Sequence, residues 1–298
     1  MKKVIRMLIM ITFFGISLSQ TIYAKSIDNF FFVNSNNIKM SQEDVTNLKN
    51  LGFSSEEIDI MDENTYFNNK DLVGKVVATS YKYMKTTNYF INGNDTMPFN
   101  SVTSEVTEAE YENESDIIPY GVCGTVSTEY KLLTSEIVKI GSKYRYKATL
   151  TWKKMPKVRG YDIIGIGIDN TVSVDSTSQG FSNAVKYDDG TTANKTSPYK
   201  RNVSSTGEAV SFKLYSNTLK KKVTNMIISM YFDVNKLTSN SITTLNAYAD
   251  YAHRKDTNDI SSVSFSVGYA GISFGVSSDA TKYDSMNTAH AIADNLKW

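Results

Sequence analysis

The sequence contains very little cysteine, histidine and proline. Of its 298 residues, one is a cysteine, two are histidines and four are prolines. The single cysteine, Cys123, excludes an intramolecular disulfide, so the stability of the fold must come from its core. Two histidines cannot form a three-histidine metal site, and the sequence has no HExxH motif. We therefore expect no bound metal and no other cofactor.

The chain also lacks an excess of charge of either sign. It has 32 Lys and Arg residues against 31 Asp and Glu residues, which gives no general attraction to nucleic acid. One segment is strongly one-sided, because residues 101–120 contain six acidic residues and no Lys or Arg. Such a run is typical of a solvated loop or a short helix, and its spacing does not match the Ca²⁺ loop of an EF-hand.

Only the N-terminus has a long apolar run. Lys2, Lys3 and Arg6 precede the run Met7–Leu18, and the small residue Ala24 follows it, as in a cleaved export signal. The run is shorter than the ~20 residues that a membrane span needs, which makes an N-terminal anchor the less favoured alternative. Cleavage after Ala24 predicts a secreted protein and changes the formal net charge from +1 to −2.

Residues 41–66 have the spacing of two or three short helices. Ser41 and Ser54 are each followed three positions later by an acidic residue, as in a capping box, and Asp62 can cap a further turn. The spacing is similar to that of helix-turn-helix modules, but the segment holds seven acidic residues against one lysine, which disfavours DNA binding. We predict a helical N-terminal cap over residues 25–72.

The rest of the chain, residues 73–298, alternates between apolar and polar residues with the period of two that half-buried strands require. The clearest strands, Tyr144–Trp152 and Tyr161–Ile168, are separated by a basic turn and are predicted to form a hairpin. Residues 175–205 are predicted to be a long polar loop. Because no amphipathic helices separate the strands, we predict a mainly β fold, an antiparallel β-sandwich of roughly nine to eleven strands.

Two of these stretches also suggest a family. The run WKKMPKVRGYDIIGIGID (residues 152–169) and the earlier LKNLGFSSEEIDIMDENTY (residues 48–66) resemble a group of uncharacterised secreted proteins from Gram-positive bacteria. LNAYADYAHRKDTNDISSVSFSV and YDSM resemble weaker parts of the same pattern. The resemblance implies an exported protein with a small helical head and a β-rich body. It implies no catalytic residues, because the group has no assigned activity.

The basic turn between the two clearest strands is the candidate binding site. Four cations at one tip would suit an anionic wall polymer, a lipid headgroup or an acidic glycan, whereas a solvated turn is the simpler interpretation. The candidate residues are Lys153, Lys154, Lys157 and Arg159. In the following strand, Gly165 and Gly167 leave one face without side chains, where another backbone or a ligand can approach.

The stretch Ser262–Ser278 carries two further patterns. Gly271–Gly275 matches the GxSxG nucleophile elbow, and Asp284 and His290 follow in triad order, but both flanks alternate like strands and little chain remains. The apolar residues also change parity across Ala270–Gly271, which predicts either a tight hairpin or a bulged strand. The alternation is similar to that of pore-forming hairpins, although each arm is shorter than the ~9–11 residues of a membrane strand.

These features predict an exported protein that binds rather than catalyses, at a cell surface or on an extracellular polymer or protein. Tyr and Asn side chains are the expected contact groups. The alternative is a pore-forming or membrane-damaging β-toxin, and a secreted hydrolase is a third possibility. The predicted organisation is a signal peptide (residues 1–24), a helical cap (residues 25–72) and a β-sandwich domain (residues 73–298). No nucleic acid is expected among the partners, membrane contact is not favoured, and nothing in the sequence indicates the oligomeric state.

Overall fold

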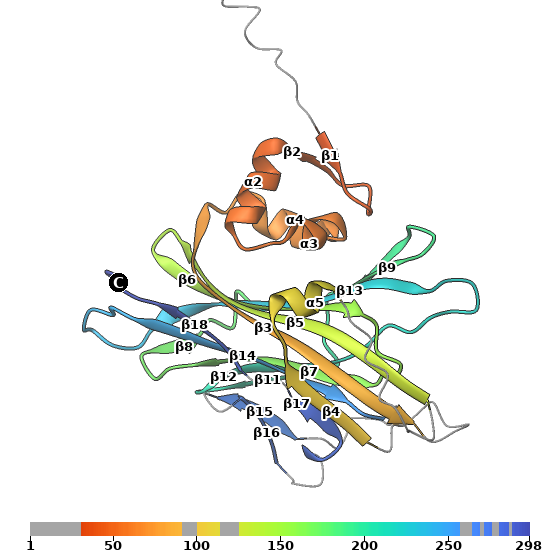
Figure 1. Cartoon of the computed structure of the whole chain (residues 1–298). Coiled ribbons are helices and arrows are strands. Elements are labelled where there is room, and N and C mark those ends of the chain that lie inside the picture. Colours follow the sequence, from red (N-terminus) through yellow and green to blue (C-terminus); the bar gives the residue numbers. More distant parts are fainter. Residues whose placement is uncertain are drawn as a thin grey trace, which may run out of the picture.

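The computed structural model describes residues 31–90, 100–113, 125–256, 264–268, 271–275, 280–285 and 288–298. The predicted signal peptide and Cys123 lie outside these residues. The described part of the chain is mainly β, with 18 strands and four short helices, and its strand pairs are antiparallel (Figure 1). The mainly β antiparallel class is therefore confirmed.

The number of strands exceeds the predicted nine to eleven, partly because residues 175–205 are not a loop. This stretch contains β9 (Gly180–Tyr187), β10 (Thr192–Lys195) and β11 (Lys200–Ser204). Its polar composition suggested a loop, but β10 and β11 are short strands at the edges of two sheets, where polar side chains face water.

The larger sheet has eight strands. Seven of them follow the order β10-β9-β13-β6-β5-β3-β4, and β8 pairs with one end of β13. The remaining members are β3 (Gly74–Phe90), β4 (Asn100–Glu105), β5 (Thr125–Ile140), β6 (Lys143–Lys154), β8 (Val172–Val174) and β13 (Val223–Lys236).

The smaller sheet has six strands. Five of them follow the order β11-β12-β7-β14-β17, and β18 also pairs with β14. Its members besides β11 are β7 (Tyr161–Ile168), β12 (Gly207–Lys213), β14 (Leu245–Arg254), β17 (Tyr283–Ser285) and β18 (Ala289–Ala293).

The hairpin predicted from β6 and β7 is wrong. β6 pairs with β5 and β13 in the larger sheet, whereas β7 pairs with β12 and β14 in the smaller one. Residues 155–160, which include Pro156, carry the chain from one sheet to the other. The alternation of side chains fixed the two faces of each strand, but it holds no information on which strand lies beside it.

Apolar side chains from both sheets meet in one large cluster. Leu133 of β5 and Leu150 of β6 belong to it from the larger sheet, and Ile164 of β7 and Tyr251 of β14 belong to it from the smaller one. Trp152 packs edge-to-face on Tyr251, with ring centroids 6.1 Å apart, and is 1% exposed, as expected from its position in the alternation.

Residues 31–72 form a head that packs on the outer face of the larger sheet (Figure 1). The predicted capping boxes at Ser41 and Ser54 are both present, and Asp62 caps a third helix. Leu48, Phe53 and other apolar residues of the head cover Val138 and Tyr231 of the sheet. The head consists of β1 (Phe31–Val33), β2 (Lys39–Ser41), α2 (Gln42–Asn50), α3 (Ser55–Asp59) and α4 (Glu63–Asn69).

A small hairpin, β15 (Phe265–Gly268) and β16 (Gly271–Phe274), covers the outer face of the smaller sheet. Gly268 lies opposite Gly271, so the hairpin alternative holds and both apolar sets share one face. A Cβ atom at Gly167 would lie 2.7 Å from the carbonyl oxygen of Gly268. A Cβ atom at Gly165 would lie 3.1 Å from the Val267 side chain, so the face of β7 without side chains is filled by this hairpin.

Candidate functional site

An open groove of about 760 Å³ crosses the outer face of the larger sheet. Its floor consists of side chains from β3, β5 and β6, and the head forms one wall through Phe53, Ser54 and Glu56. The other wall contains Tyr111 and Glu112 of α5 (Glu108–Asn113), which lies on the same side of the sheet as the head (Figure 1). The groove is a depression between two elements that stand on one sheet.

Hydroxyl groups form a row across the floor of the groove. Tyr81 of β3 lies opposite Thr134 of β5, and Thr134 lies opposite Thr149 of β6. Ser229 of β13 lies opposite Thr149 but under the head and outside the groove lining, while Thr151 lies two residues further along β6 on the same face. Because neighbouring strands are about 4.8 Å apart, the register of the sheet spaces these hydroxyls regularly.

Tyrosine rings form the edge of the groove near α5. Tyr81 is 54% exposed, and its ring is nearly parallel to that of Tyr83, with 6.3 Å between centroids and 24° between planes. Tyr83 in turn packs on Tyr111 of α5, at 5.1 Å. Burial, together with a hydrogen bond to Glu108, raises the pKa of Tyr83 to about 12, so the phenol stays neutral. This edge offers an aromatic face beside the row of hydroxyls.

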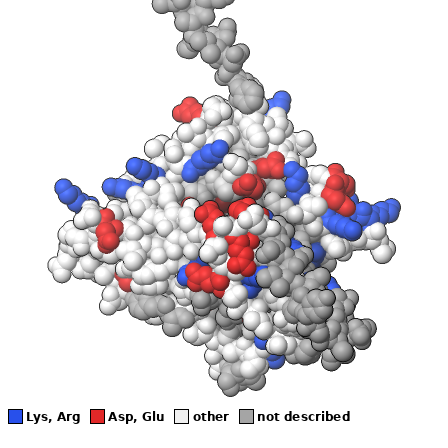
Figure 2. Space-filling view, in the orientation of Figure 1, with Lys and Arg blue, Asp and Glu red and all other residues white. Residues whose placement is uncertain are grey.

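Charged groups of the groove are largely paired with each other. The lining contains three lysines and four glutamates. Lys153 binds Glu112 at 2.8 Å, and its ammonium lies 4.9 Å from the ring centroid of Tyr111. Figure 2 shows carboxylates gathered in the middle of this face, near α5. The nearly equal numbers leave a surface of low net charge.

The acidic segment that the sequence singled out helps to form this wall. Its described part, residues 101–113, is the end of β4 and the whole of α5, so the short-helix interpretation holds for residues 108–113. Lys82 of β3 binds Glu105 of the neighbouring β4, and Lys85 of β3 binds Glu110 of α5; both pairs are partly exposed. The second pair ties α5 to the sheet, although exposed ion pairs contribute little each to stability. Residues 114–120 lie outside the described residues.

The head is joined to the sheet through a buried lysine next to the groove. The ammonium of Lys147 donates to the carbonyl of Gly52 at 2.8 Å and to the carboxylate of Glu57 at 3.0 Å. It also donates to Thr149 at 2.8 Å and lies 3.4 Å from Glu136. Burial would lower the pKa of Lys147, but the two carboxylates outweigh it and raise that pKa above its usual value. Burial also raises the pKa of Glu136, against the effect of Lys147.

A second set of polar contacts between the head and the sheet is centred on Arg145. Arg145 donates through Nε to Asp233 at 2.7 Å and through a terminal nitrogen to Asn69 of the head at 2.6 Å. Its guanidinium lies 4.2 Å from the ring centroid of Tyr231. The contacts of Lys147 and Arg145 hold the head in one position, and therefore keep one wall of the groove fixed.

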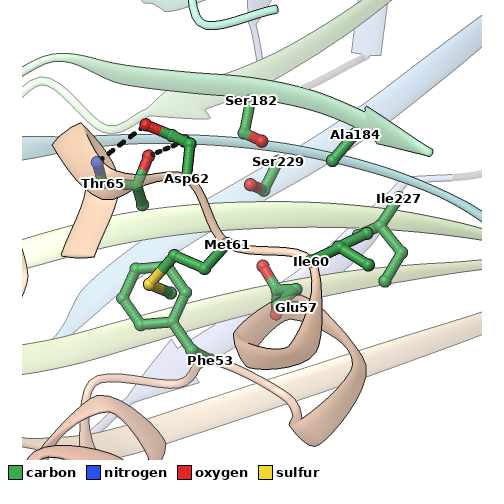
Figure 3. A pocket seen from close by; sticks show the side chains of 10 residues that line it. All are labelled: Phe53, Glu57, Ile60, Met61, Asp62, Thr65, Ser182, Ala184, Ile227 and Ser229. Carbon is green, nitrogen blue, oxygen red and sulfur yellow. Dashed lines mark hydrogen bonds between the residues drawn. The ribbon is translucent and has the colours of Figure 1, made fainter. Parts of the chain in front are cut away.

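A small cavity of about 20 Å³ lies under the head, against β9 and β13 (Figure 3). Ile60, Ala184 and Ile227 lie on one side of it in the view, and Asp62 and Thr65 lie on the other. The volume suits a single water molecule, since one water needs about 10–15 Å³. The cavity belongs to the packing of the head and is too small for a larger ligand.

The four cations predicted as a binding site do not form one tip. Lys153 and Lys154 end β6, and of the four Lys153 lines the groove. Lys157 lies in the connection between the sheets, with its ammonium 4.8 Å from the ring centroid of Phe90. Arg159 donates to the carbonyl of Pro156, and burial lowers its pKa. Arg159 also donates to the Asn217 side chain, which makes it a structural side chain of this connection.

A buried ionic network lies between the two sheets, close to Trp152. Lys131 of β5 binds Asp284 of β17 at 3.0 Å, and His253 of β14 lies 2.9 Å from Asp162 of β7. Burial lowers the pKa of His253, but the Asp162 carboxylate outweighs burial and raises it. For Asp284 burial acts to raise the pKa, and Lys131 with further partners lowers it. The network is an internal pairing of charges, because Lys131 and Asp162 are each 0% exposed.

One member of this region has an unusual environment. Glu129 is 1% exposed, and burial raises its pKa despite the nearby His253 and Lys131. Its Oε1 accepts from the backbone nitrogen of Lys157 at 3.3 Å, whereas its Oε2 has no hydrogen-bond partner among the described residues. A carboxyl group in such surroundings favours its neutral form.

The serine of the GxSxG pattern is not at an elbow. Ser273 lies within β16 and opposite Ser266 of β15, so the segment is a strand where the elbow needs a sharp turn. His290 has its Nε2 atom 2.9 Å from Asn246 and stacks on Tyr248, with centroids 4.2 Å apart. Asp284 belongs to the buried ionic network, so it and His290 both have partners outside the triad that the sequence pattern suggested.

Across the described ranges, no group of three or more His, Cys, Asp or Glu side chains is arranged to hold a metal ion. In the same ranges no helix has the length and apolar character that crossing a bilayer requires. Comparison with known proteins finds no matching family model and no significantly similar curated sequence. The function is therefore inferred from the geometry of the groove.

Proposed function

We propose that the protein is an exported, non-catalytic binding protein that holds an extended polar polymer in the groove between the head and α5. We also propose that its two large sheets form an antiparallel β-sandwich, with residues 25–72 as a helical cap. The observation that carries the proposal is the groove itself, which is open, about 760 Å³ in volume and lined with Thr, Tyr, Lys and Glu side chains. A polymer strand fits an open groove better than a small molecule does, because small ligands are usually enclosed on most sides.

The arrangement of the hairpin β15–β16 supports binding over membrane insertion. Phe265 and Val267 are 2% and 3% exposed, because they pack on Ile163 and Ala209 of the smaller sheet. Asn202 and Thr206 also donate hydrogen bonds to carbonyl groups of β15. The apolar face that a membrane hairpin would need is therefore already occupied in the fold.

The proposal is tested with a substitution that fills the groove. We expect the purified protein to be retained by a cell-wall fraction or by intact cells, and Thr134→Arg to abolish this retention by placing a long side chain on the floor. Val203→Arg, at a 45% exposed position of β11 in the other sheet, is the matched control. Retention of Thr134→Arg equal to that of the parent, with both proteins folded by circular dichroism, would overturn the groove as the binding site.

A further inference from the structure

The floor of the groove cannot bind a partner through its backbone. The floor is a face of the sheet, whereas the backbone hydrogen bonds between strands lie in the plane of the sheet. β5 pairs with β3 and β6, and β6 pairs with β5 and β13, so both strands have their backbone donors and acceptors used on both sides. β3 pairs with β5 along its length but with β4 only from Met84 to Tyr89, so residues 74–82 leave an edge that lies beside the floor. An extended peptide gains much of its affinity by adding a strand to an exposed sheet edge, which the floor itself does not offer. Recognition here has to use side chains.

The side chains of the groove also do not suit a strongly charged partner. Its three lysines and four glutamates nearly cancel, and the closest pairs bind each other, as Lys147 does with Glu57 and Lys153 with Glu112. A polyanion or polycation would have to break these pairs without meeting an excess of opposite charge. The partner that this lining fits is neutral and rich in hydrogen-bonding groups.

The remaining features are a row of hydroxyls and an aromatic face. Thr134 of β5 and Thr151 of β6 each offer a hydroxyl that both donates and accepts, on neighbouring strands of the floor. The hydroxyl of Thr149 between them is buried and already bound to Lys147 and Glu57. Tyr81 adds a ring that is 54% exposed and whose plane is set by its contact with Tyr83. A pyranose ring has the matching chemistry, because it carries hydroxyls around its edge and apolar C–H groups on its faces.

We infer that the polymer held in this groove is a neutral glycan, with a sugar ring stacked on Tyr81 and neighbouring hydroxyls hydrogen-bonded to Thr134 and Thr151. This inference rests on the proposed function, since it names the chemical class of the ligand of the same groove. The aromatic contact supplies affinity, and the row of hydroxyls sets the orientation of the chain.

The test measures the affinity of the full chain for three kinds of probe. These are soluble neutral polysaccharides (α-glucan, β-glucan and chitin oligosaccharides), an anionic polysaccharide (polygalacturonate), and a library of unstructured peptides. We expect binding to at least one neutral polysaccharide and an affinity that changes less than about twofold between low and high salt, because screening acts only on charged partners.

Variants of one side chain separate stacking from nonspecific effects. Tyr81→Ala should weaken binding to the neutral polysaccharide about tenfold, and Tyr81→Phe should retain it, because the ring makes the contact. Tyr199→Ala removes a tyrosine of similar exposure, 50%, outside the groove lining and should leave binding unchanged.

The outcomes distinguish this inference from the function on which it rests. Binding to polygalacturonate or to peptides alone, lost in Thr134→Arg, would overturn the neutral glycan and leave the groove as the binding site. Failure to bind any neutral polysaccharide, or equal affinities for the parent and Tyr81→Ala, would also overturn it. Insensitivity to Thr134→Arg would instead contradict the proposed function.

Discussion

Lys147 is the residue on which the position of the head depends most directly. It is 1% exposed and its ammonium contacts Glu57 of the head and Glu136 of the sheet. Removing one partner of a buried ionic group is costly because the remaining charges stay desolvated. The two glutamates would then face each other without a cation.

We therefore expect Lys147→Met to lower the free energy of unfolding by about 3–5 kcal/mol at neutral pH. Part of this loss should be recovered in acid, because burial raises the pKa of Glu136 and its protonation removes one of the unpaired charges. Urea unfolding at about pH 5 and pH 7.5 measures both effects. Lys75→Met, at an exposed position of β3, is the control, and a loss of similar size in that variant would contradict the role of the buried site.

The carboxyl group of Asp250 predicts a second pH dependence of the free energy of unfolding, and its sign follows from the pKa. Its carboxylate accepts from the backbone nitrogens of Tyr251 and Ile272, and burial raises its pKa to about 6 despite these hydrogen bonds. A raised pKa in the folded state means that the fold binds the proton more tightly than the unfolded chain does. This contribution is fully present below the ordinary value of 3.8 and is lost as the pH rises through about 6.

The expected size of this effect is on the order of 2–3 kcal/mol between about pH 4 and pH 7.5. Asp250→Asn should flatten the dependence in this range, because an amide does not titrate. The measurement is the urea midpoint of both proteins across the range. A slope unchanged by the substitution would assign the dependence to other groups, such as Glu129 and Glu136, whose pKa values burial also raises.

At the scale of elements, the hairpin β15–β16 decides between the proposed function and the toxin alternative. Phe265 is 2% exposed against the smaller sheet, whereas the neighbouring Ser266 is exposed on the opposite face. We expect Phe265→Asp to lose cooperative thermal unfolding, because the substitution removes a ring packed on Ile163 and Ala209 and buries a carboxylate in its place. Ser266→Asp is the matched control and should unfold like the parent.

Liposome leakage completes this comparison. We expect no release of dye by the parent protein. A parent that releases dye, together with a Phe265→Asp variant that is folded, thermally normal and inactive in leakage, would support a membrane hairpin that lies loosely on the soluble form.

Local sequence patterns predicted where the helices and strands lie better than they predicted which strands pair with each other. Ser41, Ser54 and Asp62 marked the three helices of the head, since a cap depends on residues only three positions apart. The alternation around Trp152 located β6 and its buried face. It did not reveal that β7 belongs to the other sheet, because the period of two is the same for any partner strand.

The candidate site was harder to predict for a related reason. The hydroxyl row joins Tyr81, Thr134 and Thr149, which come together only through the register of three strands. Each of these residues, taken alone, resembles an ordinary polar residue on a strand. The sequence did point to Lys153, but as one of four cations at a single tip, and the fold does not keep these four together. Recognising the row requires the order and register of the three strands, which the sequence alone does not provide.

At the scale of the whole molecule, the proposed export can be tested directly. We expect the protein to appear in the culture medium and to begin at Lys25, because the segment before it has the pattern of a cleaved signal. Intact-mass analysis of the secreted material measures the start of the chain. A mass that includes residues 1–24 would contradict cleavage after Ala24 and favour an N-terminal anchor.

The crossing from β6 to β7 also determines when the protein can fold. β5 pairs with β3 and β6, and all three come early in the chain, whereas β7 pairs with residues 207–213 and 245–254. During synthesis, which starts at the N-terminus, β7 therefore cannot pair until these later strands have been made. Closing such long loops also slows folding. Until then Leu133 and Leu150 have no second sheet to cover them. We therefore expect the yield of folded protein to depend on how fast the last third of the chain is delivered.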